Sequence, residues 1–349
     1  MTVDSGQRTK WVYQGTGVPR PGSVGELPAP PPWRQFDGGP LVEPPQEEAS
    51  ETRRRLGAVQ GQTPFRSSDE QVAVINAALY LRRPLLVTGR PGTGKSSLAY
   101  RIARELCLGR VLRWSITSRS NLRQGLYEYD AIGRVQAAAA RQAVGLSQEL
   151  PQEPGVEDFL SLGPLGTALL PYEHPRVLLI DEMDKSDIDL PNDLLNVFED
   201  GEFTIPELLR VQRTNSAVTV RTDDPYREAV VTNGVVRARA FPIVVITSNG
   251  ERNFPAPFLR RCLRLTLGEP TLEELAAMVE AHFPGAMHSR LRELIREFGN
   301  RSDREGGLAA DQLLNAVHLV TSGTWEVTGA DHDETWRLLL DTLWRNLSN

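Results

Sequence analysis

Residues that build disulfide frameworks and metal clusters are scarce in this chain. Its 349 residues include two cysteines, Cys107 and Cys262, and five histidines. The cysteines lie far apart in the sequence, which argues against a disulfide framework and suits a reducing compartment, so the cytoplasm is the expected location. The histidines are scattered, without an HExxH pattern or a Cys/His cluster, which argues against a structural zinc site.

Long apolar runs are missing as well. No stretch approaches the roughly 18 uninterrupted apolar residues of a membrane span. The first ten residues are polar and lack the apolar core of an export signal. Hydrophobic content of 40% and charged content of 24% are ordinary for a globular protein. We therefore expect neither a membrane span nor export.

Lysine is rare among the charged residues. Of the 39 basic residues only Lys10, Lys95 and Lys185 are lysine, and the net charge is −6. This balance argues against a dominant nucleic-acid surface, which draws on clustered positive charge. A local basic groove remains compatible with an acidic total. Because all the other residues of this set are arginine, each lysine invites a specific explanation.

Residues 1–64 are rich in proline and glycine, a composition that does not bury enough apolar area to fold alone. Four aromatic side chains in this segment are nevertheless costly to leave in water, and they favour an extended strap that docks on the globular body or on a neighbouring chain. Plain disorder is the alternative. The four aromatic residues are Trp11, Tyr13, Trp33 and Phe36.

Residues 65–268 alternate between apolar strands and amphipathic helices, the first helix being expected over 69–81. Two of the apolar runs are continuous, as in strands of a parallel sheet that is covered on both faces. Strands alternating with helices predict a doubly wound α/β domain. The expected strands cover residues 84–88, 110–116, 176–180, 243–247 and 263–267.

Residues 269–349 switch to a purely helical pattern. Apolar residues such as Leu272, Leu275 and Val279 recur at the period of an amphipathic helix. The repetition of this pattern predicts a small helical domain of about four helices.

Residues 89–96 read GRPGTGKS and match the phosphate-loop pattern G-x-x-x-x-G-K-[ST] between a predicted strand and a predicted helix. Glycines let backbone N–H groups surround phosphate oxygens, and the helix start adds its positive end. Lys95 is expected to reach the β- and γ-phosphates, and Ser96 to offer its hydroxyl to Mg²⁺. A glycine-rich turn without a ligand is the alternative. The predicted nucleotide-binding residues are Gly89, Pro91, Gly92, Thr93, Gly94, Lys95, Ser96 and Ser97.

Two carboxylates, Asp181 and Glu182, follow the apolar run at 176–180. Ligands of doubly wound sheets bind beyond the carboxyl ends of the strands, so the pair is expected beside the phosphate loop. Asp181 would hold Mg²⁺ directly or through water, and Glu182 would polarise the water that attacks the γ-phosphate. The charged residues that follow are equally consistent with a solvated face or subunit rim: Asp184, Lys185, Asp187 and Asp189.

These motifs and their spacing resemble the AAA+ ATPases, in particular the MoxR family, from about residue 65 to the C-terminus. The resemblance extends to GPLGTA at 163–168, LPNDLL at 190–195 and FEDG at 198–201. It implies a P-loop NTPase fold followed by a helical lid at 269–349. It also implies a helix-2 insertion at about 117–160 and a hairpin at about 211–240 before the fourth strand.

The resemblance assigns roles to residues outside the two motifs. Asn249 would be the sensor-1 residue that positions the attacking water, and a turn-forming Asn-Gly pair is the alternative. Arg261, with Arg260 as the second candidate, would be the arginine finger that reaches the γ-phosphate held by the next subunit. Both arginines are also consistent with a role at the helix dipole.

One position departs from the AAA+ pattern. The family places a basic sensor-2 residue at the start of the third lid helix, where residues 307–312 read GLAADQ without a basic residue in register. Arg301 and Arg304 lie upstream as substitutes. The departure puts the coupling between nucleotide and lid in question.

The function implied by the resemblance is Mg²⁺-dependent ATP hydrolysis in a ring, expected to be a hexamer. Hydrolysis would drive chaperone-like remodelling of a client protein, with a von Willebrand factor A domain protein as partner. Leu126, Tyr127 and Tyr129 would contact a substrate in the pore or pack in the core. A nucleic-acid motor of the same fold and a nucleotide-gated switch with negligible turnover are the alternatives.

Overall fold

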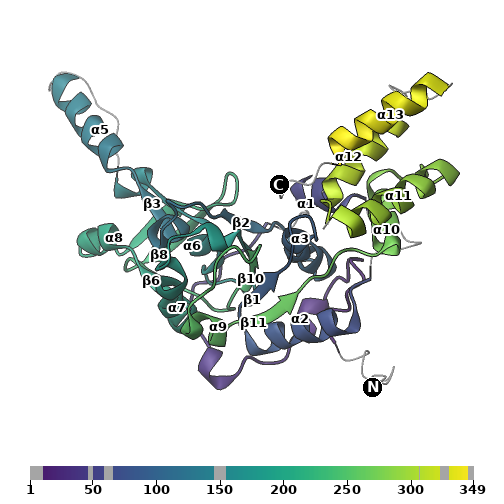
Figure 1. The fold of residues 1–349 in the computed structure, drawn as a ribbon. Coiled ribbons are helices and arrows are strands. Elements are labelled where there is room, and N and C mark those ends of the chain that lie inside the picture. Colours follow the sequence, from purple (N-terminus) through teal and green to yellow (C-terminus); the bar gives the residue numbers. More distant parts are fainter. Residues whose placement is uncertain are drawn as a thin grey trace.

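The computed structural model describes residues 11–45, 50–58, 66–144, 155–305, 307–322 and 330–344. The expectation for the first ten residues, including Lys10, lies outside this part. An α/β body occupies the middle of the molecule, with the C-terminal helices on one side and α5 (Ala131–Val144) projecting on the other (Figure 1). No helix in the described ranges combines the length and apolarity needed to span a bilayer.

The central sheet consists of parallel strands in the order β11-β1-β10-β5-β2. All five predicted strands are present, and the predicted α/β fold is confirmed. Because neighbouring strands run in the same direction, their carboxyl ends meet at one edge of the sheet. The strands are β1 (Leu85–Thr88), β2 (Leu112–Ser115), β5 (Val177–Asp181), β10 (Ile243–Ser248) and β11 (Leu263–Thr266).

Helices cover both faces of this sheet. In β5, Val177 and Leu179 face a core shared with two helices, while Leu178 and Ile180 face a second core. This alternation is the two-residue period of a strand that is buried on both sides. The first core involves α2 (Asp69–Leu81) and α3 (Lys95–Glu105), and the second involves α6 (Pro164–Ala168), α7 (Leu190–Asp200) and α9 (Ala256–Arg261).

A second sheet joins the predicted insertion to the predicted hairpin region. Its strand order is β3-β4-β7-β8-β9-β6, and the short helices α4 (Leu122–Leu126) and α8 (Pro206–Val211) accompany it. The strands are β3 (Tyr127–Tyr129), β4 (Leu160–Leu162), β6 (Glu202–Thr204), β7 (Ala217–Arg221), β8 (Glu228–Thr232) and β9 (Val235–Arg237).

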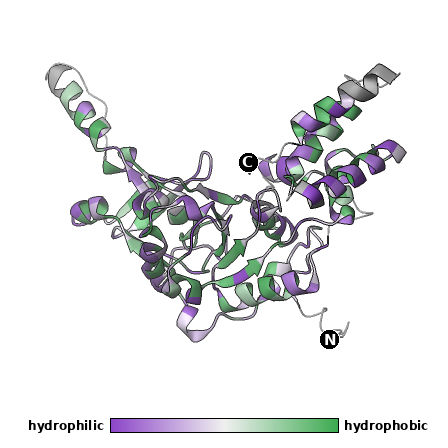
Figure 2. Cartoon of the chain, in the orientation of Figure 1, coloured by the Kyte–Doolittle hydropathy of each residue, from purple (hydrophilic) through white to green (hydrophobic). Residues whose placement is uncertain are grey.

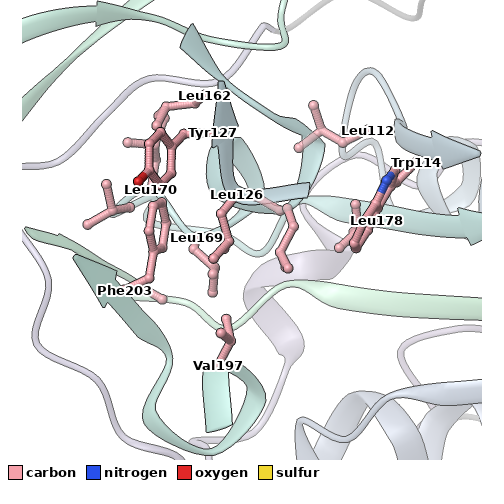
Figure 3. Packing of buried hydrophobic residues seen from close by; sticks show 14 of the residues in the cluster. Leu112, Trp114, Leu126, Tyr127, Leu162, Leu169, Leu170, Leu178, Val197 and Phe203 are labelled. Carbon is pink, nitrogen blue, oxygen red and sulfur yellow. The ribbon is translucent and has the colours of Figure 1, made fainter. Parts of the chain in front are cut away.

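Leu126 and Tyr127 pack inside this second layer. Both are buried, and the rings of Tyr127 and Phe203 are stacked with centroids 6.5 Å apart (Figure 3). The core-packing alternative therefore holds for both residues, and a pore-facing role for them is wrong. Tyr129 is partly buried against the same core.

The N-terminal segment is docked along the α/β body. Tyr13 is fully buried, and Asn76 of α2 holds its backbone from both sides, accepting from Tyr13 N at 3.0 Å and donating to Tyr13 O at 2.7 Å. Phe36 packs against Phe241, with ring centroids 5.8 Å apart. Trp33 is the exception because 74% of it is exposed. The segment contains η2 (Ser23–Glu26), η3 (Pro32–Arg34) and α1 (Ser50–Leu56).

The C-terminal helices form a third core of their own. Apolar residues at helical spacing, such as Leu275 and Val279, turn inward, and the rings of Phe298 and Trp344 meet edge to face at 5.4 Å. Figure 2 shows hydrophilic and hydrophobic residues alternating along these helices, while hydrophobic residues concentrate in the central strands. The helices are α10 (Leu272–His282), α11 (Ser289–Glu305), α12 (Ala310–Thr321) and α13 (Ala330–Leu343).

Candidate functional site

The predicted phosphate loop connects the end of β1 to the start of α3. Gly92 and Gly94 have φ angles of 81° and 82°, a left-handed conformation that glycine adopts without steric cost. A Cβ on Gly92 would lie 2.4 Å from Ala309 Cα, so the C-terminal helices approach the loop too closely for any other residue. Because glycine tolerates the left-handed conformation at both positions, the loop can turn its backbone N–H groups toward a ligand.

Lys95 lies at the centre of this loop. Its ammonium donates to Gly89 O at 2.8 Å and to Arg90 O at 2.7 Å, and the residue is 7% exposed. Burial lowers the pKa of Lys95, and the nearby carboxylates, Asp184 first among them, oppose this effect. The loop thus encloses a positive charge that suits a phosphate group.

Asp181 points from the end of β5 into the same space. Its carboxylate accepts from Ser96 Oγ at 2.6 Å, Thr247 Oγ1 at 2.8 Å and Arg113 Nη2 at 2.7 Å. Burial alone would raise the pKa of Asp181, but these hydrogen bonds outweigh burial and hold it below the ordinary value. The carboxylate is therefore ionised at neutral pH beside the phosphate loop.

The donor set fits Mg²⁺ held jointly by protein and phosphate. Asp181 and Ser96 offer a carboxylate and a hydroxyl oxygen, and such hard oxygen ligands suit this ion. Within the described part of the chain, no group of three or more His, Cys, Asp and Glu side chains lies close enough to hold a metal. Mg²⁺ commonly binds through one or two carboxylates together with substrate phosphates.

Glu182 follows Asp181 in a left-handed backbone conformation, with φ of 61°. Non-glycine residues in this conformation carry strain that is often found at functional sites. The Glu182 N–H donates to Thr247 Oγ1 at 2.9 Å, and its carboxylate pairs with Lys185 Nζ at 2.9 Å. In this conformation the carboxylate is turned toward Lys185, with both side chains 44% exposed.

Asp184 is buried, in contrast to the charged residues around it. Its Oδ2 accepts from Asn249 N at 2.9 Å and from Glu251 N at 3.1 Å, so it fixes the loop that follows β10. The solvated-face interpretation is therefore wrong for Asp184, because the residue is 3% exposed and its carboxylate accepts from two backbone N–H groups. Lys185, Asp187 and Asp189 are exposed. Asn249 lies at the carboxyl edge of the sheet, next to the end of β5.

A cavity of about 350 Å³ adjoins the phosphate loop. Its walls come from the loop, from the beginning of the helical region and from the N-terminal segment, and its size suits a small ligand. The lining includes Gly92, Thr93, Gly94 and Ser97 of the predicted site, Thr16, Gly17 and Arg55 of the N-terminal segment, and Glu269, Leu275 and Ala310 of the helical region. Pro91 is exposed at the tip of the loop.

Glu105 fixes the part of the N-terminal segment that lines this cavity. The side chain is fully buried at the end of α3, and its carboxylate accepts from the backbone N–H groups of Gln14, Gly15, Thr16 and Gly17 at 2.5 to 3.2 Å. One carboxylate thus satisfies four backbone donors and ties the segment to the helix that begins at the phosphate loop.

The start of α12 brings alanine rather than a cation to the phosphate loop. Ala309 meets Gly92, and Arg90 of the loop pairs with Glu269 at 2.9 Å. Arg301 pairs with Asp341 at 2.5 Å, and neither it nor Arg304 lines the cavity. Among the described residues, the contacts between the loop and the C-terminal region include this close packing and the exposed Arg90–Glu269 ion pair.

Arg260 and Arg261 lie away from the phosphate loop of their own chain. They end α9 and precede β11, whose first residue, Leu263, pairs with Leu85 at the start of β1. The phosphate loop follows the other end of β1, and that strand spans about 10 Å. Arg260 is exposed and Arg261 half-exposed, so the structure does not bring them to the remaining predicted residues.

Sequence reasoning missed the residues that hold this site in place. Arg113 and Thr247 bind Asp181 through hydrogen bonds across neighbouring strands, and such pairings depend on the strand order. Thr247 was visible only as a polar residue at the end of an apolar run. Glu105 looked like an ordinary helical glutamate.

The model of the AAA domain, dynein-related subfamily, matches residues 84–262. That range begins just before β1, ends with α9, and includes the phosphate loop and the acidic pair. No curated protein matches the chain.

Proposed function

The chain belongs to the AAA domain family, in its dynein-related subfamily, and on that premise we propose that it is a Mg²⁺-dependent ATPase of the MoxR type. Membership in the family implies an ATP-driven enzyme of the AAA+ class. The observation that carries the proposal is the hydrogen bond from Ser96 of the phosphate loop to Asp181 of β5, at 2.6 Å. It joins the two halves of a phosphate and metal site.

The residues of the site have separate roles in the proposed hydrolysis. Backbone N–H groups of the loop and the Lys95 ammonium bind the phosphates, and Ser96 and Asp181 would hold Mg²⁺, which supplies charge neutralisation when bound. Glu182 leaves Lys185 and orients the attacking water, with Asn249 beside it. The strained backbone of Glu182 supports this functional assignment.

The position of Arg261 supports a site shared between two chains. Because this residue lies across the sheet from its own phosphate loop, it reaches a γ-phosphate only in another chain. Head-to-tail association that repeats this contact closes into a ring when the rotation between neighbouring chains closes, and such closure is part of the proposal. We propose a hexamer, in keeping with the MoxR resemblance. Trans-acting fingers contribute about 10³ to 10⁵ in rate.

We propose that the energy of ATP hydrolysis is used to remodel a client protein. The contact of Gly92 with Ala309 and the Arg90–Glu269 pair link the loop to the helical lid. We propose that nucleotide in the adjoining cavity changes the position of the lid through these contacts. A client protein and a partner with a von Willebrand factor A domain are part of this proposal.

Two substitutions test the proposal. Lys95→Ala removes the ammonium and is expected to weaken ATP binding by about 10- to 150-fold, since one charged hydrogen bond contributes roughly 1.5 to 3 kcal/mol. Glu182→Gln is expected to bind ATP normally and to release phosphate at least about 100-fold more slowly. Equilibrium binding and phosphate release measure the two effects. Tight ATP binding by Lys95→Ala, or normal turnover by Glu182→Gln, would contradict the proposal.

A further inference from the structure

The backbone around Arg260 and Arg261 is fixed by a third arginine. Arg83, just before β1, donates from Nε to Arg261 O at 3.0 Å and from Nη2 to Arg260 O. These are among the last carbonyls of α9, which have no partner within the helix. Arg83 thereby fixes the backbone position of both candidate finger residues at the end of α9.

The two side chains are held differently. Arg261 Nε donates to Glu199 Oε1 at 2.6 Å. Arg260 is exposed, and its guanidinium has no hydrogen-bond or ion-pair partner among the described residues. Glu199 belongs to α7, within the FEDG motif at 198–201. The partner of Arg261 therefore comes from a different element.

Glu199 is in turn held by the N-terminal segment. Its second oxygen, Oε2, lies 3.4 Å from Arg34 Nη2. Arg34 is 5% exposed, lies over the ring of Phe241 at 5.4 Å and donates to Phe198 O. Burial lowers the pKa of Arg34, and Glu199 opposes that effect, whereas the charges of Arg83 and Arg261 add to it. Two guanidinium groups, those of Arg34 and Arg261, thus meet on one carboxylate, and the charge of Arg83 acts on Arg34 from nearby.

We propose that Glu199 is the positioning residue for Arg261 and makes Arg261, rather than Arg260, the finger. The inference rests on the trans-acting finger proposed above. Glu199 occupies the Nε–H of Arg261 and leaves both terminal amino groups for phosphate oxygens, which suit a bidentate contact. Without Glu199, repulsion from Arg34 displaces the Arg261 guanidinium.

Glu199→Ala tests this role, with Asp200→Ala as the matched control. Asp200 is the next residue of α7 and is also exposed. Misplacement of a catalytic group by about 1 Å costs about 100-fold in rate. We therefore expect Glu199→Ala to lower kcat about 10- to 100-fold, with KM for ATP within about twofold of the unmodified protein, because Glu199 is remote from its own phosphate loop. Asp200→Ala is expected to leave both unchanged.

Mixing experiments separate positioning from a general structural defect. Glu199→Ala chains mixed with Glu182→Gln chains are expected to regain activity, because some shared sites combine an intact Glu182 with an intact Glu199–Arg261 pair. Mixtures of Glu199→Ala with Arg261→Ala are expected to regain none, because both changes damage the same side of the site.

Three results would overturn the inference. The first is an unchanged or raised kcat in Glu199→Ala. The second is recovery of ATPase activity when Glu199→Ala chains are mixed with Arg261→Ala chains. The third is no recovery of activity when Glu199→Ala chains are mixed with Glu182→Gln chains, under conditions where Arg261→Ala and Glu182→Gln chains do complement. If Arg261→Ala alone leaves kcat unchanged, the shared site itself fails, and the role of Glu199 fails with it.

Discussion

Lys95 carries the charge at the centre of the phosphate loop, and its burial decides how firmly it holds a proton. Its ammonium already donates to two loop carbonyls, an arrangement that keeps the compact charge in place for phosphate. A planar arginine side chain has a different donor geometry. This explains a lysine at position 95 in a chain that otherwise uses arginine.

The pH dependence of ATP binding follows from the lowered pKa of Lys95. Desolvation moves this pKa below the ordinary 10.5, and only the ammonium form binds phosphate well. ATP therefore binds with full affinity at pH values below the lowered pKa of Lys95. Above that pKa its affinity falls by up to about tenfold per pH unit. ATP dissociation constants between pH 7 and 10.5 measure the effect.

Lys95→Arg serves as the control for this titration. Arginine stays charged over the whole range, so the variant's weaker ATP affinity is expected to be flat with pH. A flat profile for the unmodified protein up to pH 10.5 would contradict the assignment of Lys95.

Single residues differ in how far sequence alone could place them. Lys95, Ser96 and Asp181 belong to short motifs whose chemistry requires those residue types, and the structure brings them together. Arg113 and Thr247 do not, because each becomes relevant only through the strand next to it. Long-range pairing of this kind leaves no local pattern in the sequence.

At the scale of elements, strands with continuous apolar runs were predictable, whereas of the second sheet only the hairpin at about 211–240 was expected, and that from the family resemblance. The strands of this sheet are three to five residues long, too short for periodicity to identify. They also pair residues that are distant in sequence, such as Tyr127 with Leu162 and Glu202 with Arg237. The hydrophobic layer between the sheets arises from these pairings (Figure 3).

The N-terminal segment shows why composition alone misjudges an element. Proline and glycine content predicts little burial, yet Glu105 and Asn76 satisfy its backbone from the folded body. Glu105→Gln weakens these charged hydrogen bonds, which contribute roughly 1.5 to 3 kcal/mol each. We expect the free energy of unfolding to fall by about 2 kcal/mol and ATP affinity to fall several-fold, because Thr16 and Gly17 line the cavity.

Denaturant unfolding and ATP binding measure both effects, and Glu26→Gln is the control. Glu26 lies in the same segment, and its side chain is 63% exposed in its pair with Arg20, so its loss costs little. Equal effects of the two substitutions would mean that Glu105 does not fix the cavity wall.

At the scale of the whole molecule, the sheet separates the two halves of the proposed catalytic machinery. The phosphate loop, Asp181 and Glu182 lie at the carboxyl ends of the strands, whereas Arg261 precedes the amino end of β11. The Glu199–Arg34 contact places the N-terminal segment beside Arg261 as well as at the cavity. One segment thus touches both the nucleotide side and the finger side of the chain.

The central claim is that each ATP site is built from two chains, and mixed subunits test it most directly. Glu182→Gln and Arg261→Ala chains, each expected to be nearly inactive alone, are combined in equal amounts under conditions that exchange subunits, and phosphate release is measured. In a head-to-tail ring about a quarter of the shared sites then receive both intact groups, so activity should rise to about a quarter of that of the unmodified protein. A mixture no more active than its two components, in rings that still form, would contradict the account.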